Sequence, residues 1–172
     1  MTTKPKVAVK DANVFIDMEY MGILDLWFQL GYETITSDLV VRELEEGQHF
    51  QALAYVDSSQ ILALSLPLDV VNEMQQSHAG ISSTDAAVLH LAVKYKALLL
   101  SGDRQLRNAA RVELVEYHGS IWVLDQLVRN QKLTGFLAAE KLSALVALEG
   151  KQKRFLPEKS AGEQIKHWRE MP

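Results

Sequence analysis

The sequence predicts an α/β fold, a three-layer sandwich in which helices cover both faces of a mostly parallel β-sheet. Short apolar segments of strand length alternate with longer segments of helical periodicity through the first 117 residues. Strands that alternate with helices are joined by right-handed crossovers, and these favour parallel pairing with helices on both faces. The run Leu98 to Leu100 has the continuous apolar character of a buried strand.

In the first half of the chain, the expected strands cover residues 6–10, 33–36 and 61–65. The expected helices cover residues 13–30, a segment after Ser37 that contains Glu43, residues 49–57, and the segment from Pro67 to Gly80. Apolar residues at helical spacing predict the first helix, and Ser37 is a good N-cap for the second. Gly31 and Gly80 are typical of the positions where helices end.

In the second half, Ser82 precedes Asp85 by three residues before an apolar run, which is typical of a helix start. Further elements are expected as a strand at 98–100, a helix at 104–110, a strand at 114–117, helices at 120–130 and 136–148, and a linker at 150–157.

The composition suits one hydrophobic core, because 48% of the 172 residues are hydrophobic. The absence of cysteine excludes disulfides, thiol catalysis and thiolate metal sites. Neither an apolar run of membrane-spanning length nor a signal peptide is apparent, so we expect a cytoplasmic protein that makes no contact with a membrane.

The formal net charge of -4 weakly disfavours nucleic-acid binding. The acidity belongs to residues 1–150, however, because residues 151–172 carry six Lys and Arg against three Glu. A body that gathers carboxylates in one cleft can still bind RNA if metal ions neutralise that cleft.

Four carboxylates are candidates for such a cleft. Asp11 and Asp103 each follow a short apolar strand, and ligands of open α/β sheets bind beyond the carboxyl ends of the strands. Asp85 and Glu43 occupy the first and second turns of their helices, near the same edge. Clustered carboxylates repel one another unless a cation compensates. Oxygen ligands without cysteine suit Mg²⁺ or Mn²⁺, which would support hydrolysis of a phosphodiester.

Four segments of the sequence match, in order, the acidic motifs of a known family. They are Asp11-Ala12-Asn13-Val14-Phe15-Ile16-Asp17, Val41-Arg42-Glu43-Leu44, Ser83-Thr84-Asp85-Ala86-Ala87, and Leu100-Ser101-Gly102-Asp103-Arg104-Gln105-Leu106. With these motifs the chain resembles the PIN-domain family of VapC-like and PilT N-terminus-like ribonucleases. The resemblance spans roughly residues 7–125.

The resemblance implies a Rossmann-like sheet and a Mg²⁺ or Mn²⁺ ribonuclease that cleaves single-stranded RNA, in many relatives as the toxin of a toxin–antitoxin pair. Asp11, Glu43, Asp85 and Asp103 correspond to the family's catalytic acids. Asp11, Asp85 and Asp103 would hold the metal, directly or through water. Asn13 and Ser101 would orient ligands from a second layer. We expect a PIN-like nuclease domain over residues 1–130 and a helical C-terminal extension over 131–172.

Three of the four acids also have a simpler interpretation, which leaves a second function open. Asp85 completes a capping box, Asp103 is a reasonable N-cap, and Glu43 suits a solvated helix face. The alternative is therefore a non-catalytic PIN-like protein that binds RNA or a partner protein. Another Asp-dependent phosphohydrolase ranks last, because Asp11-Ala12-Asn13 lacks a second Asp two residues on.

Several other polar residues are weaker candidates. Arg104, Arg107 and Arg111 form a basic stripe at helical spacing, which suits either RNA contact or a solvated face. Asp17 and Asp125 lie near the motifs, and we expect both on helix surfaces. The five histidines show no ligand spacing.

The helix expected over residues 13–30 also predicts self-association. Its apolar residues exceed what one helix face can bury; they are Ile23, Leu24, Leu26, Trp27 and Phe28. We therefore expect a homodimer, which is also how toxins of the resembling family commonly assemble. The other partners expected are the RNA substrate and an antitoxin protein.

Overall fold

A five-stranded sheet forms the centre of the molecule, and each strand runs parallel to its neighbours. The computed structural model describes residues 6–149 and 156–171. The strands are β1 (Lys6–Lys10), β2 (Tyr32–Ser37), β3 (Ile61–Leu64), β4 (Leu98–Leu100) and β5 (Tyr117–His118). Their order across the sheet is β3-β2-β1-β4-β5. This order places β1 at the centre, and the chain reverses direction across the sheet beside it.

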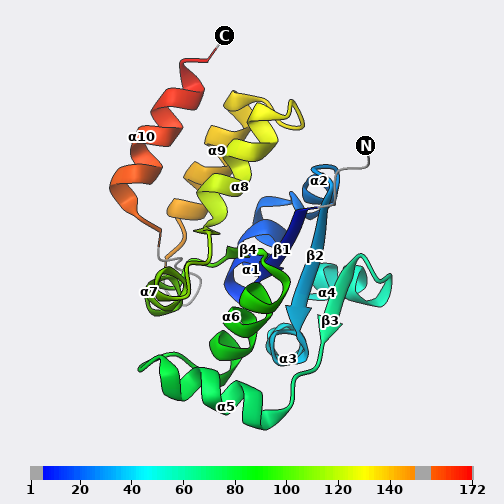
Figure 1. Ribbon diagram of the computed structural model, residues 1–172. Helices are drawn as coiled ribbons and strands as arrows, with labels where there is room; N and C mark the ends of the chain where they lie inside the picture. The colour runs from blue at the N-terminus through cyan, green and yellow to red at the C-terminus, as the bar shows by residue number, and fades with distance from the viewer. Residues whose placement is uncertain (1–5, 150–155, 172) are drawn as a thin grey trace, which may run out of the picture.

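Helices lie on both sides of the sheet, as Figure 1 shows, which confirms the expected α/β fold. The helices of the first half are α1 (Ala12–Met21), α2 (Leu24–Phe28), α3 (Asp38–Glu46), α4 (Phe50–Asp57) and α5 (Leu68–Ser77). Those of the second half are α6 (Ser83–Tyr95), α7 (Arg104–Val112), α8 (Ser120–Arg129), α9 (Gly135–Val146) and α10 (Glu158–Arg169). Most of the linker expected at 150–157 lies outside the described residues.

One expected helix is divided into two. Residues 13–30 were expected to form a single helix, but α1 ends at Gly22, whose φ of 63° is left-handed. The Gly22 amide donates to Glu19 O and the Ile23 amide to Met18 O, which ends α1 before α2 begins. In the same way Gln48, with φ of 59°, separates α4 from α3.

Polar caps start the helices where the sequence predicts them. Ser37 Oγ accepts from the Val40 amide at the start of α3, and Ser82 Oγ accepts from the Asp85 amide at the start of α6. The Asp85 carboxylate accepts in return from the Ser82 amide, which completes a capping box.

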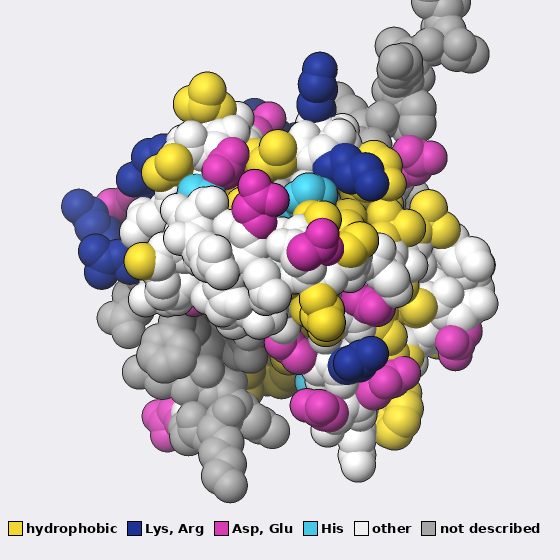
Figure 2. All heavy atoms as spheres, turned by 60° about the horizontal axis from the view of Figure 1, so that its bottom comes forward, with side chains coloured by type: hydrophobic (Ala, Val, Ile, Leu, Met, Phe, Trp, Pro, Cys, Tyr) yellow, Lys and Arg dark blue, Asp and Glu magenta, His cyan; other side chains and the backbone are white. Residues whose placement is uncertain are grey.

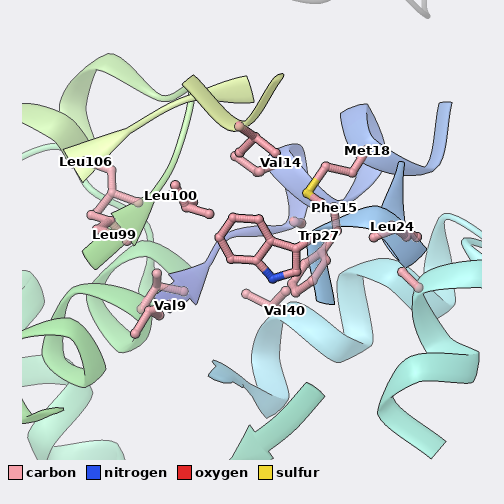
Figure 3. Close-up of a cluster of buried hydrophobic side chains, with 14 of the residues drawn as sticks. Val9, Val14, Phe15, Met18, Leu24, Trp27, Val40, Leu99, Leu100 and Leu106 are labelled. Atoms are coloured by element: carbon pink, nitrogen blue, oxygen red, sulfur yellow. The ribbon is translucent and has the colours of Figure 1, made fainter. Parts of the chain in front are cut away.

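Three of the five apolar residues behind the dimer prediction are buried within the chain itself. Figure 3 shows Trp27 of α2 in the middle of the core, among side chains that include Val14, Phe15 and Val40. Trp27 is fully buried, and its Nε1 donates to Thr34 Oγ1 over 2.8 Å. Ile23 and Leu24 are also buried, whereas Leu26 and Phe28 are partly buried, which weakens the reason for a homodimer. Self-association stays a prediction.

The last two helices form a hairpin beside the sheet. α9 packs against α1 and α8, and α10 packs against α9. Lys141 of α9 donates to Met21 O at the end of α1 over 2.6 Å, and Arg169 of α10 pairs with Glu140 of α9 at 3.0 Å. Among the described residues, none of the helices is long and apolar enough to span a membrane.

The two glycines Gly22 and Gly162 predict opposite responses to the same substitution. Gly22→Ala should lower the free energy of unfolding by about 1 kcal/mol, because alanine is strained in a left-handed conformation. Gly162→Ala should raise it by about 0.5 to 1 kcal/mol, because Gly162 lies within α10 with open space around its Cα. Urea denaturation of both variants measures the two changes. Equal effects would show that backbone conformation does not set them.

Candidate metal and nucleic-acid site

The carboxyl ends of β1 and β4 lie side by side. Lys10 pairs with Leu100 at the end of both strands, so the residues that follow them, Asp11 and Ser101, leave the sheet together. The Asp11 amide donates to Leu100 O over 3.2 Å. This confirms the expectation that Asp11 and Asp103 reach the same edge of the sheet.

Asp11 is a buried carboxylate with partners on two elements. Only 4% of the residue is exposed. Its Oδ1 accepts from the Val14 amide over 3.1 Å, which caps α1, and its Oδ2 accepts a short hydrogen bond from Ser101 Oγ. The Asp11 side chain therefore joins the start of α1 to the turn after β4.

Ser101 extends this contact to Asp103. Its Oγ accepts from the Asp103 amide over 3.0 Å while it donates to Asp11. The Asp103 Oδ1 in turn accepts from the Leu106 amide over 2.8 Å and caps α7. Asp11, Ser101 and Asp103 thus form one hydrogen-bonded chain. Sequence reasoning expected Ser101 in a supporting position, and its hydroxyl does contact both acidic residues.

The environment of Asp11 favours its protonated form. Burial raises the pKa of the Asp11 carboxyl from its ordinary 3.8 to about 7, and the nearby charges of Asp85 and Asp17 raise this pKa as well. The hydrogen bonds from Ser101 and Val14 act in the opposite direction and lower it. Burial is the largest of these effects, so the pKa of Asp11 remains raised despite its two hydrogen bonds.

Asp85 and Glu43 are placed differently from each other. Asp85 lies close enough to Asp11 to influence its pKa, although its carboxylate also accepts from the Ser82 amide and hydroxyl. Glu43 is exposed on α3. Within residues 6–149 and 156–171, no three or more acidic or histidine side chains form a group that could hold a metal ion. The four acids therefore do not make a closed cage.

Asp17 was expected on a helix surface, and that expectation is wrong. Asp17 is only 5% exposed, and its Oδ2 accepts from Ser120 Oγ at the start of α8 over 2.5 Å. A signal was available in the sequence, because residue 17 lies on the stripe of α1 that contains Val14, Met18 and Met21. Asp125 is partly buried and pairs with Arg129 one turn later.

A cleft of about 980 Å³ opens beside Asp103. Residues from α1, the turns after β4 and β5, α7, α8 and α10 line it; among them are Asn13, Asp17, Asp103, Arg104, His118, Trp122, Asp125, Ser160 and Gln164. Figure 1 shows the start of α10 close to α7 and the start of α8. The contribution of α10 was not predicted from the sequence.

The three arginines of the expected stripe have separate environments. Arg104 is exposed and lines the cleft. Arg107 also lines it, but its Nε donates to Ser101 O over 2.7 Å, so it supports the turn after β4. Arg111 donates to the Tyr117 hydroxyl over 2.9 Å. Figure 2, a view turned to bring the lower side of Figure 1 forward, shows acidic and basic side chains interspersed rather than a single basic patch.

Comparison with known proteins decides the family. The family model described as "DUF3368: PIN domain" matches residues 7–170. The chain belongs to the PIN-domain family. The match includes residues on both sides of position 130, and the division into a domain and an extension at that position stays a prediction.

Solved structures support the same fold for this PIN-domain protein. A PilT N-terminus domain protein, SSO1118, from the archaeon Sulfolobus solfataricus P2 has a TM-score of 0.51 and 14% identity. That likeness covers 74% of this chain and 95% of that one. PAE2754 from Pyrobaculum aerophilum has a TM-score of 0.54 and 18% identity, with coverage of 74% and 97%. No protein with a curated function matches the chain.

The pKa of Asp11 predicts a pH dependence of stability in metal-free buffer. The folded pKa of about 7 lies above the unfolded value near 3.8, so the fold binds this proton more tightly than the unfolded chain does. Stability should therefore fall as pH rises between these values, by at most about 1.4 kcal/mol per pH unit. Asp11→Asn should lack this contribution, because Asn caps a helix equally well and does not titrate.

Urea denaturation of both proteins in EDTA at several pH values tests this prediction. The stability of Asp11→Asn relative to the native protein should increase from pH 4 to pH 7. Parallel curves for the two proteins would contradict the raised pKa.

Proposed function

We propose that this PIN-domain protein is a metal-dependent ribonuclease that hydrolyses phosphodiester bonds of single-stranded or looped RNA, in the cytoplasm. The observation that carries the proposal is the hydrogen-bonded chain of Asp11, Ser101 and Asp103, in which Asp103 lines the cleft. Buried carboxylates with raised pKa values are typical of functional sites. PIN-domain proteins are typically nucleases that use divalent metal ions.

The donors present fit Mg²⁺ or Mn²⁺. Asp11, Asp85 and Asp103 would supply hard oxygen ligands, and a cation would favour the charged form of Asp11, whose pKa burial raises. Mg²⁺ needs only one or two protein carboxylates because it keeps several waters, so a closed cage is not required. The ion would supply Lewis-acid chemistry, polarising the phosphodiester and lowering the pKa of a water molecule.

The chain's own residues would hold and orient the substrate. Ser101 keeps the Asp11 carboxylate in one orientation and, through the Asp103 amide, ties it to the rim of the cleft. Arg104 is exposed on that rim, where it would contact phosphate. Asn13 is exposed in the cleft and would hydrogen-bond the substrate or its waters. Glu43 would complete the acidic edge from α3.

One observation favours the non-catalytic alternative, a PIN-like protein that binds RNA or a partner protein. Asp11 and Asp103 are both N-caps, and Asp85 belongs to a capping box, so each acid already has a structural role. Capping uses only some of the lone pairs of a carboxylate, so it does not prevent metal binding. A toxin role with an antitoxin partner is a finer proposal that is supported by the family resemblance alone.

Metal binding should stabilise the folded protein. At pH 8, Mg²⁺ or Mn²⁺ at a hundred times its Kd should raise Tm by about 5 °C or more, because it binds only the folded state. The shift should shrink at pH 5.5, where Asp11 is protonated and the metal must displace a proton. Differential scanning fluorimetry measures the shift. Asp11→Asn should abolish it, and a wild-type shift equal at both pH values would contradict the assignment of Asp11.

RNA cleavage should depend on Asp103. Asp103→Asn should lower the rate of single-stranded RNA cleavage in Mn²⁺ or Mg²⁺ by about a hundredfold or more, since even indirect metal partners are commonly worth 10- to 100-fold. The helix α7 should persist because Asn is also a good N-cap. RNA affinity should be largely retained, because phosphate contacts from groups such as Arg104 carry it. Gel analysis of labelled RNA and fluorescence anisotropy measure the two properties.

Asp57→Asn is a matched control, since Asp57 is exposed at the end of α4, before β3 begins. It should cleave like the native protein, and EDTA should stop both. Equal activity in Asp103→Asn and the native preparation would identify the nuclease as a contaminant and favour the non-catalytic alternative.

A further inference from the structure

The cleft beside Asp103 contains a pair of stacked aromatic rings that the proposed chemistry does not use. His118 lies at the end of β5 and Trp122 in the first turn of α8. Their ring centroids are 4.4 Å apart and their planes differ by only 9°. Both residues line the cleft, and both are partly exposed.

The ring pair is held rigidly from the core outward. Trp122 meets the Tyr32 ring edge-on with centroids 6.4 Å apart, and Tyr32 stacks on the buried Trp27 at 4.8 Å. On the outer side, His118 Nε2 and Glu116 Oε1 lie 2.9 Å apart. A rigid aromatic surface loses little conformational entropy when a flat ligand binds to it.

Helix α10 provides another part of the cleft lining. Ser160 and Gln164 of this helix line the cleft together with the ring pair. The helix is docked firmly, because Ala161 and Trp168 are each 1% exposed against α9. The cleft is therefore bounded by packed elements, with hydroxyl and amide groups that can hydrogen-bond the edge of a base.

The charges of the cleft suit a base better than a long run of phosphates. Its described cationic side chains are Arg104 and Arg107, and Arg107 already donates to Ser101 O. Asp17 accepts from Ser120, and Asp125 pairs with Arg129. The volume of about 980 Å³ is at the upper end of the range for small-ligand pockets and leaves room for an unpaired nucleotide.

We propose that this cleft holds an unpaired nucleobase of the RNA against the His118–Trp122 pair, with Ser160 and Gln164 of α10 available to its edge. The inference rests on the proposed ribonuclease function and adds a subsite next to Asp103. Stacking on aromatic rings tolerates any base, so the subsite selects single-stranded RNA over duplex RNA rather than a particular sequence.

Tryptophan fluorescence in EDTA tests the proposal without any cleavage. The protein has three tryptophans, of which Trp27 and Trp168 are buried, so Trp122 is the one that a ligand can reach. A short single-stranded RNA should quench this fluorescence as it binds. Trp122→Phe should keep a ring against Tyr32 and retain binding by anisotropy, but should lose the quenching.

His118→Ala measures the contribution of stacking. It should weaken binding of the same RNA by about 5- to 100-fold, the usual effect of removing an aromatic ring from beneath a base. Tyr95→Ala is the matched control, because Tyr95 is 43% exposed at the end of α6 and does not line the cleft. It should leave the affinity unchanged. An RNA of the same charge that lacks its bases should bind native protein and His118→Ala equally.

The outcomes separate this proposal from the ribonuclease function. Unchanged affinity in His118→Ala together with unquenched Trp122 overturns the subsite, even if the native protein cleaves RNA. A third outcome is quenching of Trp122 and the expected loss of RNA affinity in His118→Ala, but no RNA cleavage in the presence of Mg²⁺ or Mn²⁺. This outcome supports the nucleobase cleft and overturns the ribonuclease function. Loss of folding in His118→Ala would be seen by circular dichroism, and the Trp122→Phe measurement then decides.

Discussion

The candidate site depends on how the buried carboxylate of Asp11 is accommodated. A carboxylate in a protein interior is costly unless hydrogen bonds or charges compensate. Here the start of α1 supplies one donor, the Val14 amide, and the turn after β4 supplies another, the Ser101 hydroxyl. Because Ser101 also accepts from the Asp103 amide, the Asp11 carboxylate is linked both to the start of α1 and to the turn between β4 and α7.

The hydrogen bonds to Asp11 compensate for its burial only in part. Two hydrogen bonds lower the pKa of Asp11, yet burial still leaves it at about 7. Asp11 also caps α1 and accepts from Ser101, roles that an apolar side chain could not fill. A buried carboxylate with a raised pKa is typical of functional sites, and this is part of the support for the ribonuclease proposal.

Helix α10 of the C-terminal hairpin α9–α10 lines one side of the cleft at the edge of the sheet. α9 is fastened to α1 through Lys141, and α10 is fastened to α9, so residues more than 140 positions after Asp11 reach the cleft beside Asp103. Capping by Asp103 and the placement of the His118–Trp122 pair both occur at this edge. The catalytic chemistry that we propose and the recognition that we infer are therefore adjacent but use different side chains.

The sequence by itself determined β1 to β4, most helix starts and the positions of Asp11 and Asp103, because strand periodicity, caps and strand ends depend on residues a few positions apart. The strand predicted at 114–117 was misplaced, since β5 is Tyr117–His118 and Leu114 is exposed with a positive φ. Only the tertiary structure decided the rest. Asp17 is buried and accepts a hydrogen bond from Ser120, which lies 103 positions later in the chain. The three arginines have different environments because Arg107 donates to Ser101 O and Arg111 donates to the Tyr117 hydroxyl. The burial and the contacts of these side chains depend on which distant elements pack together, and the spacing of residues along the sequence does not determine that packing.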